Sequence, residues 1–198
     1  MRQNLLSVGL TWVVLGMCVT PVLAQTKPAP STTPAVPPVS GPVLVTVPAA
    51  APADVASIDS IVAALYDVIS GPAGKPRDWA RMRSLFVPGG RLMPTSPRQG
   101  AVAMRIWEVN DYIAQSGPHL ERVGFREREL ARRTEQFGSI AHVFSTYEGR
   151  NQADAAVLRG VNSIQLMNDG TRWWVVSVFW AAEQPDNPVP AKYLQTSP

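Results

Sequence analysis

The segment RWWVVSVFW, from Arg172 to Trp180, restricts the possible folds more than any other part of the chain. With the two-residue period of a strand, its side chains divide into two faces: Trp173, Val175, Ser177 and Phe179 on one, and Trp174, Val176, Val178 and Trp180 on the other. A strand in a one-sided antiparallel sheet alternates apolar with polar residues, but here both faces are apolar. We therefore predict that both faces of this strand are covered.

Strand patterns fill the C-terminal part of the chain, at residues 122–134, 140–148, 157–167 and 172–180. The turn signal Asn168-Asp169-Gly170 joins the last two strands. Shorter strands are predicted at residues 91–95 and 101–107, with a turn at Pro97–Gly100 between them. Hairpin connections of this kind favour antiparallel pairing.

Helical periodicity marks the N-terminal part of the domain, at residues 54–69, 78–86 and 110–116. Asp54 and Asp78 are the expected N-caps of the first two helices. The expected helix stops are Gly71-Pro72, Pro88-Gly89-Gly90 and Gly117-Pro118. Helices that precede a run of hairpin-connected strands indicate an α+β fold rather than a parallel α/β sheet.

The first 24 residues have the pattern of an export signal: a positive start, an apolar run, and the cleavage site Val22-Leu23-Ala24. The run is too short for a comfortable membrane span, so no stable span is expected after cleavage. The domain is then periplasmic or secreted. The alternatives are an uncleaved anchor and lipid attachment at Cys18, although Met17 disfavours attachment. Cys18 is the one cysteine of the chain, so the mature protein would contain no disulfide.

Residues 25–53 are rich in proline and alanine, and 8 of these 29 residues are proline. Proline removes amide donors and fixes φ, so a helix or a central strand is excluded here. We predict a disordered, extended linker, in which Val43–Val47 is an apolar patch that could dock as an edge strand. Residues 54–198 are left as the working domain.

The order of elements resembles that of the nuclear transport factor 2-like superfamily, also called SnoaL-like. The segments that carry the resemblance are IVAALYDVISGP, DWARMRSLFVPGGRLMP, IAHVFSTYE and NSIQLMNDGTRWWVVSVFW. It extends over residues 55–194. The resemblance implies a cone-shaped fold, in which a curved antiparallel sheet wraps around the N-terminal helices and encloses a pocket. It also implies dimers formed through the outer face of the sheet. Enzymes and non-catalytic binders share this fold, so the resemblance does not assign a function.

Pairing the last two strands across a two-residue turn places Asn162 opposite Ser177 and Gly160 opposite Phe179 on the predicted inner face. The other face mixes tryptophans with hydrogen-bonding groups, which is typical of a partner surface. We therefore expect a homodimer whose interface includes Arg159, Gln165, Trp174, Val176 and Trp180. In this pairing Arg159 would stack on Trp180. The alternative is that the linker or the C-terminal tail covers this face.

Candidate ligand-binding residues in the pocket are Tyr66, Trp79, Tyr147, Asn162 and Ser177. Candidate catalytic residues are His142 and Glu127, as acid or base. The expected register places Glu127 beside Ser145, and His142 beside Leu130 on the opposite face. The structural alternatives are a half-buried histidine and a solvated strand of alternating charges, since Glu127 lies in the segment REREL.

Several functions are not supported by the sequence. There is no phosphate-binding loop or dinucleotide fingerprint, and the two histidines lack metal-ligand spacing, so we expect no cofactor and no metal. The net charge is +3 and the arginines alternate with glutamates, so nucleic acid is not an expected partner. The prediction is a non-catalytic module that binds a small, mostly apolar ligand. The alternative is an enzyme of the dehydratase, isomerase or hydrolase kind.

Overall fold

The structure is a computed structural model that describes residues 47–152 and 157–195. The export signal, Cys18 and most of the linker lie outside these residues, so export and lipid attachment stay predictions. Val47, the end of the predicted apolar patch, is the first described residue. Within the described residues, no helix combines the length and the apolar character that crossing a membrane requires.

The helices are α1 (Pro52–Val55), α2 (Ile58–Ile69), α3 (Trp79–Leu85), α4 (Val109–Val123) and the short 3-10 helix η1 (Ala191–Tyr193). Ser57 caps α2 in a reciprocal capping box with Ser60. Asp54 is therefore not the cap of this helix, as had been expected, and its carboxylate instead pairs with Arg81 at 2.8 Å. Asp78 caps α3 as predicted, by accepting a hydrogen bond from the backbone amide of Arg81 (2.8 Å).

Two of the predicted helix stops are wrong. Helix α3 ends at Leu85, and the segment Pro88–Gly90 lies inside a strand that begins at Phe86. Helix α4 continues through Pro118 to Val123, because proline removes only one intrahelical hydrogen bond, on an exposed side of the helix. Gly124, with a φ of 68°, ends α4 instead, in a conformation that other residues rarely adopt.

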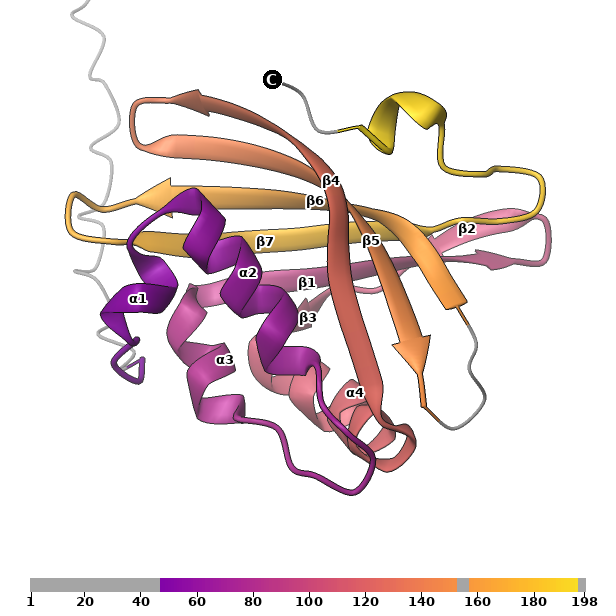
Figure 1. Cartoon of the computed structure of the whole chain (residues 1–198), viewed down its shortest axis with the longest axis horizontal. Helices are drawn as coiled ribbons and strands as arrows, with labels where there is room; N and C mark the ends of the chain where they lie inside the picture. The colour runs from indigo at the N-terminus through magenta and orange to yellow at the C-terminus, as the bar shows by residue number, and fades with distance from the viewer. Residues whose placement is uncertain (1–46, 153–156, 196–198) are drawn as a thin grey trace, which may run out of the picture. The chain divides into compact units, whose positions relative to one another are not determined.

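The sheet contains β1 (Phe86–Arg98), β2 (Ala101–Met104), β3 (Trp107–Glu108), β4 (Phe125–Phe137), β5 (Ile140–Asn151), β6 (Val157–Asn168) and β7 (Trp173–Ala182). The strand order is β2-β1-β7-β6-β5-β4, and β3 pairs with β1 (Figure 1). Within the described residues β1 and β7 pair in parallel, and the other pairs are antiparallel. The α+β prediction is confirmed, with a mixed, mostly antiparallel sheet.

The register of β6 and β7 differs from the prediction. The connection spans the four residues 169–172, and a bulge interrupts the pairing between Gln165 and Leu166. Asn162 therefore lies opposite Trp180, and Gln165 lies opposite Ser177. Because a one-residue slip exchanges the two faces of a strand, the bulge turns Trp180 inward and Ser177 outward.

The register of β4 and β5 also differs, because the turn is Gly138-Ser139 and a bulge lies between Glu129 and Ala131. Glu127 pairs with Gly149, not with Ser145. His142 pairs with Glu135, not with Leu130. A bulge changes the register along only part of a strand, so no single turn position would have predicted both pairs.

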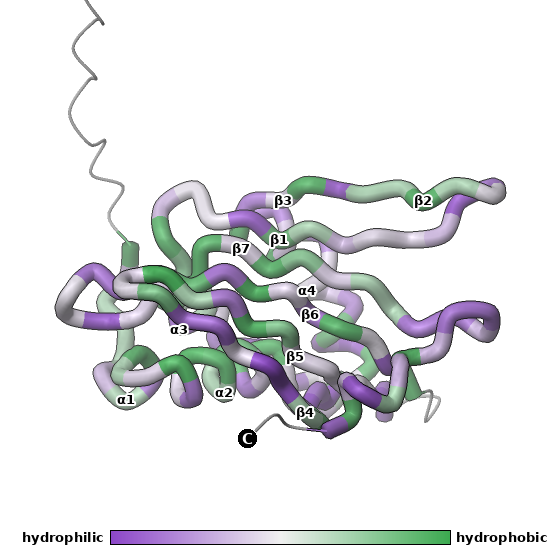
Figure 2. Tube along the Cα trace, turned by 90° about the horizontal axis from the view of Figure 1, so that it is seen from above, coloured by the Kyte–Doolittle hydropathy of each residue, from purple (hydrophilic) through white to green (hydrophobic). Residues whose placement is uncertain are grey.

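The helices pack against one face of the sheet, with α2 beside β4 (Figure 1). Residues 58–69 of α2 are largely apolar, whereas β4 carries many hydrophilic residues (Figure 2). A hydrophobic core lies between the helices and the sheet. Its most deeply buried side chains include Ile61, Val62, Met82, Leu85, Phe86, Val143, Ile164 and Val175. Burial of this apolar surface is the main stabilising contribution of the domain.

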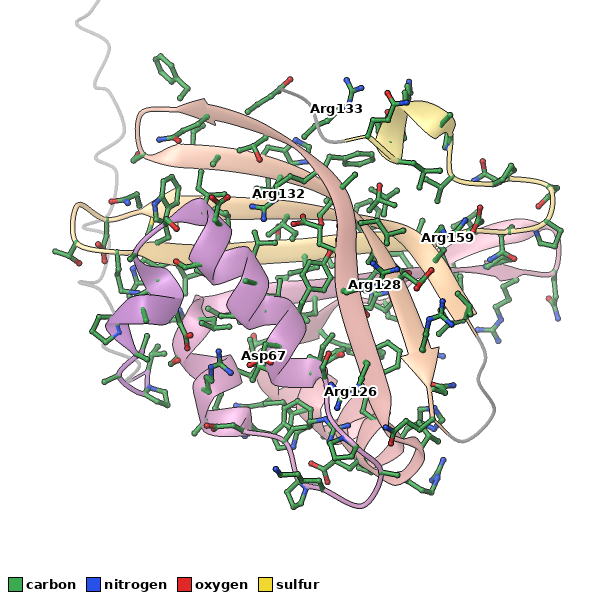
Figure 3. All side chains as sticks on the ribbon, in the orientation of Figure 1. Asp67, Arg126, Arg128, Arg132, Arg133 and Arg159 are labelled. Carbon is green, nitrogen blue, oxygen red and sulfur yellow. The ribbon has the colours of Figure 1, made fainter. Side chains whose placement is uncertain are left out.

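The C-terminal tail covers part of the outer face of the sheet, over β4 and β5. The ring of Tyr193 packs edge-on against Phe144 at 5.0 Å, and Thr146 donates a hydrogen bond to the carbonyl of Tyr193 (2.6 Å). Figure 3 shows Arg133 close to η1, and its guanidinium donates to the carbonyl of Lys192 (3.0 Å). The tail thus covers β4 and β5, which lie beside the β6–β7 hairpin. The cover predicted from the sequence was for β7 itself.

A buried guanidinium joins the ends of two helices to the start of β4. Arg77 is only 7% exposed. It donates to carbonyls at the C-terminal ends of α2 and α4: those of Ile69 (3.1 Å), Gly71 (2.7 Å) and Leu120 (3.1 Å). Carbonyls at helix C-termini carry partial negative charge, so a cation is favourable there. Gly71 in turn exchanges two backbone hydrogen bonds with Phe125, the first residue of β4.

We expect the substitution Arg77→Met to destabilise the domain by about 3 kcal/mol or more, because several carbonyls would each lose a charged donor at once. The free energy of unfolding of the full chain, measured by urea denaturation, checks this. Arg98→Met, at an exposed position in the β1–β2 turn, is the matched control and should change the stability by less than about 0.5 kcal/mol. Equal effects of the two substitutions would contradict a structural role of Arg77.

Candidate functional site

A pocket of about 440 Å³ lies between the inner face of the sheet and the helices α2 and α4. This volume is within the range of small-molecule sites. Apolar and aromatic side chains form most of its wall, and the rest of the lining is polar. The lining includes Tyr66, Trp107, Tyr112, Glu127, Tyr147, Asn162 and Trp180.

Glu127 is the carboxylate in the lining of this pocket, and it extends from the inner face of β4. Its strand is held in place by α2, because the backbone amide of Glu127 donates to the hydroxyl of Ser70 (2.9 Å). Burial raises the pKa of Glu127 to about 7, and a hydrogen bond from Asn162 opposes this rise. A carboxyl group with this pKa exchanges its proton readily near neutral pH.

A chain of hydrogen bonds behind the pocket has a defined direction. It begins at Glu129, whose carboxylate pairs with Arg132 at 2.7 Å. Ser145 donates its hydroxyl proton to Glu129 (2.5 Å). A hydroxyl has only one proton, so the 2.7 Å contact between Ser145 and Tyr66 requires Tyr66 to be the donor. The proton of Tyr66 therefore points away from the pocket.

The same chain then continues to Glu127. With its proton directed to Ser145, the oxygen of Tyr66 accepts a hydrogen bond from the amide nitrogen of Asn162 (3.0 Å). The same nitrogen of Asn162 makes a second hydrogen bond, which it donates to Glu127 Oε1 (3.4 Å). Asn162 thus presents donors on both sides, which leaves the facing oxygen of Glu127 as an acceptor.

Two further tyrosines point into the pocket without this constraint. Within the described residues, neither the hydroxyl of Tyr112 nor that of Tyr147 has a hydrogen-bond partner. Burial and the nearby charge of Glu127 raise the pKa of both phenols, so both stay protonated. They are therefore free to donate to an oxygen atom of a bound molecule. Gly160 makes room for Tyr147, since a Cβ there would lie 2.6 Å from its hydroxyl.

Four of the seven predicted site residues lie together in this pocket: Tyr66, Glu127, Tyr147 and Asn162. The other three do not line it. Trp79 lies between α3 and α4, where its indole donates to Glu121 (2.9 Å). Ser177 lies on the outer face because of the bulge in the β6–β7 pair. His142 also lies on the outer face, within hydrogen-bonding distance (2.9 Å) of the hydroxyl of Ser163.

The residues predicted for a dimer interface are divided between the two faces of the sheet. Trp180 lines the pocket, with its ring edge-on to Tyr112 at 6.4 Å, so it is not available to a partner. Gln165 and Val176 are exposed on the outer face. Trp174 is also on this side, but it is held by its own turn: it donates to Asp169 (2.6 Å), and Arg172 stacks on its ring at 3.6 Å.

Arg159 does not stack on Trp180 as predicted, because the two side chains lie on opposite faces of the sheet. Its guanidinium approaches Glu148 and Glu183, each at 3.8 Å. Glu148 is almost fully buried and also pairs with Arg128 and Arg150, which hold its pKa below the usual value. Figure 3 shows Arg126 and Arg128 along β4 and Arg159 on the neighbouring part of the sheet. Self-association through this face stays a prediction.

Sequence reasoning did not include Tyr112 and Trp107 among the pocket residues. Trp107 lies in β3, at the end of the strand predicted at residues 101–107. With α4 extended to Val123, the residues Tyr112, Gln115, Ser116 and His119 recur at helical spacing on one side. All four line the pocket. Three of them lie within the helix predicted at residues 110–116, so this periodicity could have identified Tyr112 from the sequence, and Gly117-Pro118 concealed only His119.

Within the described residues, no group of three or more histidine, cysteine or acidic side chains is arranged to hold a metal ion.

Comparison with known proteins gives a likeness at the level of the fold. No protein-family profile matches the sequence, and no curated protein matches it. A solved structure from Kribbella flavida has a TM-score of 0.51 at 11% identity, covering 65% of this chain and 90% of its own. A protein of unknown function with a cystatin-like fold from Nostoc punctiforme has a TM-score of 0.48 at 13% identity, covering 67% and 92%.

A third structure, a nuclear transport factor 2-like protein of unknown function from Silicibacter pomeroyi, has a TM-score of 0.43 at 14% identity, covering 65% of this chain and 94% of its own. The α+β fold of this chain is similar to that of nuclear transport factor 2-like and cystatin-like proteins. At such low identities the likeness concerns the fold, and proteins with this fold have diverse or unknown functions. The function of this chain has to be argued from its own pocket.

The raised pKa of Glu127 predicts how stability depends on pH. Between the ordinary value of 4.5 and the folded value of about 7, the unfolded chain loses the proton while the folded domain keeps it. Wild-type stability should therefore fall across this window by about 3 kcal/mol, because one pKa unit corresponds to about 1.4 kcal/mol. In Glu127→Gln this contribution is absent.

Urea denaturation of the wild type and of Glu127→Gln at about pH 5 and about pH 8 measures the difference. We expect the variant to be more stable than the wild type at the higher pH and similar to it at the lower. The exposed Glu135→Gln is the matched control and should behave as the wild type does. A wild-type advantage at the higher pH would mean that the ionised form of Glu127 is favoured in the folded state.

Proposed function

We propose that this chain is an enzyme that transfers a proton on a small, mostly apolar substrate, with Glu127 as the general base. One observation carries the proposal: a carboxyl group with a pKa of about 7 faces an apolar pocket, and Asn162 holds it as an acceptor. A base whose pKa lies near the working pH combines a large ionised fraction with a useful affinity for protons.

The reaction class follows from the groups that surround the base. Tyr112 and Tyr147 can donate hydrogen bonds to a carbonyl oxygen of the substrate, and these bonds strengthen as negative charge develops on that oxygen. Glu127 removes the proton from the adjacent carbon, and the electron pair moves into the carbonyl to form an enolate. Where a β,γ double bond is conjugated with the enolate, return of the proton to the γ-carbon moves the double bond to the α,β position and completes an isomerisation. Departure of a leaving group from the β-carbon completes an elimination.

The geometry supports this proposal over the binding-only function that the sequence favoured. That preference depended on the lack of a recognisable polar pair within the pocket. Glu127 and Asn162 form such a pair, and two phenols without partners lie in the same lining. A purely apolar ligand would leave the two phenols without partners, which is unfavourable.

A direct test is the exchange of α-protons for deuterium in apolar ketones such as 2-tetralone, followed by NMR in heavy water. We expect the purified full chain to accelerate exchange, with a rate that rises with pH as Glu127 ionises, and with a midpoint near 7. Glu127→Gln should lower the rate at least about 100-fold and remove the rise. Tyr112→Phe and Tyr147→Phe should each lower the rate by about 10- to 100-fold without moving the midpoint.

His142→Gln is the matched control, because His142 lies on the outer face and touches no pocket residue of the proposal. It should leave both the rate and the pH profile unchanged. Retention of the wild-type rate in Glu127→Gln would refute the role of Glu127. Absence of exchange in the wild type, together with tight binding of the same ketones, would favour the non-catalytic binding module.

A further inference from the structure

The rim of the pocket differs in chemistry from its interior. Tyr66, Tyr147 and Asn162 in the interior are each less than a tenth exposed. By contrast, the polar lining residues Arg105, Gln115 and His119 are exposed. The interior of the pocket is thus buried and lined mostly by apolar and aromatic side chains, whereas its mouth is exposed and polar. A molecule that fills the pocket is therefore expected to have an apolar body and a polar end.

Arg105 supplies a cation at this mouth. It is placed by a backbone hydrogen bond to the carbonyl of Pro94 (3.1 Å), and its guanidinium lies 5.8 Å from the centre of the Trp107 ring, which lines the pocket. Within the described residues, no carboxylate lies within ion-pair distance of Arg105. Its charge is therefore available to a ligand.

His119 supplies a second donor. The guanidinium of Arg122 lies 2.9 Å from Nδ1 of His119. An arginine can only donate, so Nδ1 accepts and the imidazole carries its proton on Nε2. The N–H group at Nε2 can therefore donate to an anion at the mouth. The side-chain amides of Gln115 and Asn151 add further donors to the lining.

We propose that the substrate is an amphiphile, with an apolar body in the pocket and an anionic oxygen group, such as a carboxylate, at the mouth against Arg105 and His119. This inference rests on the proposed function for the chemistry at the inner end. Charge decides the orientation, because an anion placed inside would lie beside the ionised Glu127 in a medium of low polarity. The anionic group therefore stays outside, and the carbon to be deprotonated points inward.

The test is a binding titration of the full chain that follows the fluorescence of the pocket tryptophans. The two probes are decanoate and decanol, which have the same chain length and differ in charge. At low salt we expect Arg105→Ala to weaken decanoate about three- to tenfold and decanol less than about twofold. Arg105→Lys should retain most of the decanoate affinity, and added salt should reduce the difference between the wild type and Arg105→Ala.

Arg98→Ala is the matched control, since Arg98 is exposed at the end of β1 and does not line the pocket. If Arg105→Ala weakens both probes equally or neither of them, the anionic end is refuted. In that case the role of Glu127 still stands, and ketone exchange tests it separately. If the wild type binds neither probe, the amphiphile inference fails, and ketone exchange then decides whether the proposed function fails with it.

Discussion

The arrangement of the site depends on the buried guanidinium of Arg77. Its hydrogen bonds to carbonyls at the ends of α2 and α4, together with the Gly71–Phe125 backbone pair, fix where three elements meet. These elements are α2, α4 and β4, and they carry Tyr66, Tyr112 and Glu127 respectively. A cation is suited to this position because helix C-termini present several unpaired carbonyls to one point. The distances among the three functional groups follow from this junction.

Two bulges then decide which side chains the sheet presents to the pocket. The bulge in the β6–β7 pair turns Trp180 inward and Ser177 outward. The bulge in the β4–β5 pair lies just after Glu129 and changes the register of the strand beyond it. Each bulge lets one strand present apolar side chains to different faces along its length. This explains why Arg172–Trp180 has no simple alternation of apolar and polar residues.

The polar groups in the pocket form a directed set. The ion pair of Glu129 and Arg132 fixes the direction of the Ser145 hydroxyl proton, and this proton fixes the next one along the chain. Tyr66 consequently acts through Asn162, whereas Tyr112 and Tyr147 keep free donors. Buried networks of this kind specify roles as well as stability, because each donor has one favourable partner. At the entrance of the pocket, Arg105 adds a further donor, which carries a positive charge.

The sequence by itself determined the α+β class, the presence of most helices and strands, and four of the pocket residues, because the periods of apolar residues and the turn signals are local. Only the tertiary structure decided the sides of Trp180 and Ser177, the membership of Tyr112, and the shifted pKa of Glu127. Register depends on bulges and loop length, and a one-residue change exchanges the faces of a strand. A pKa depends on burial by segments far apart in the chain, which no local pattern contains.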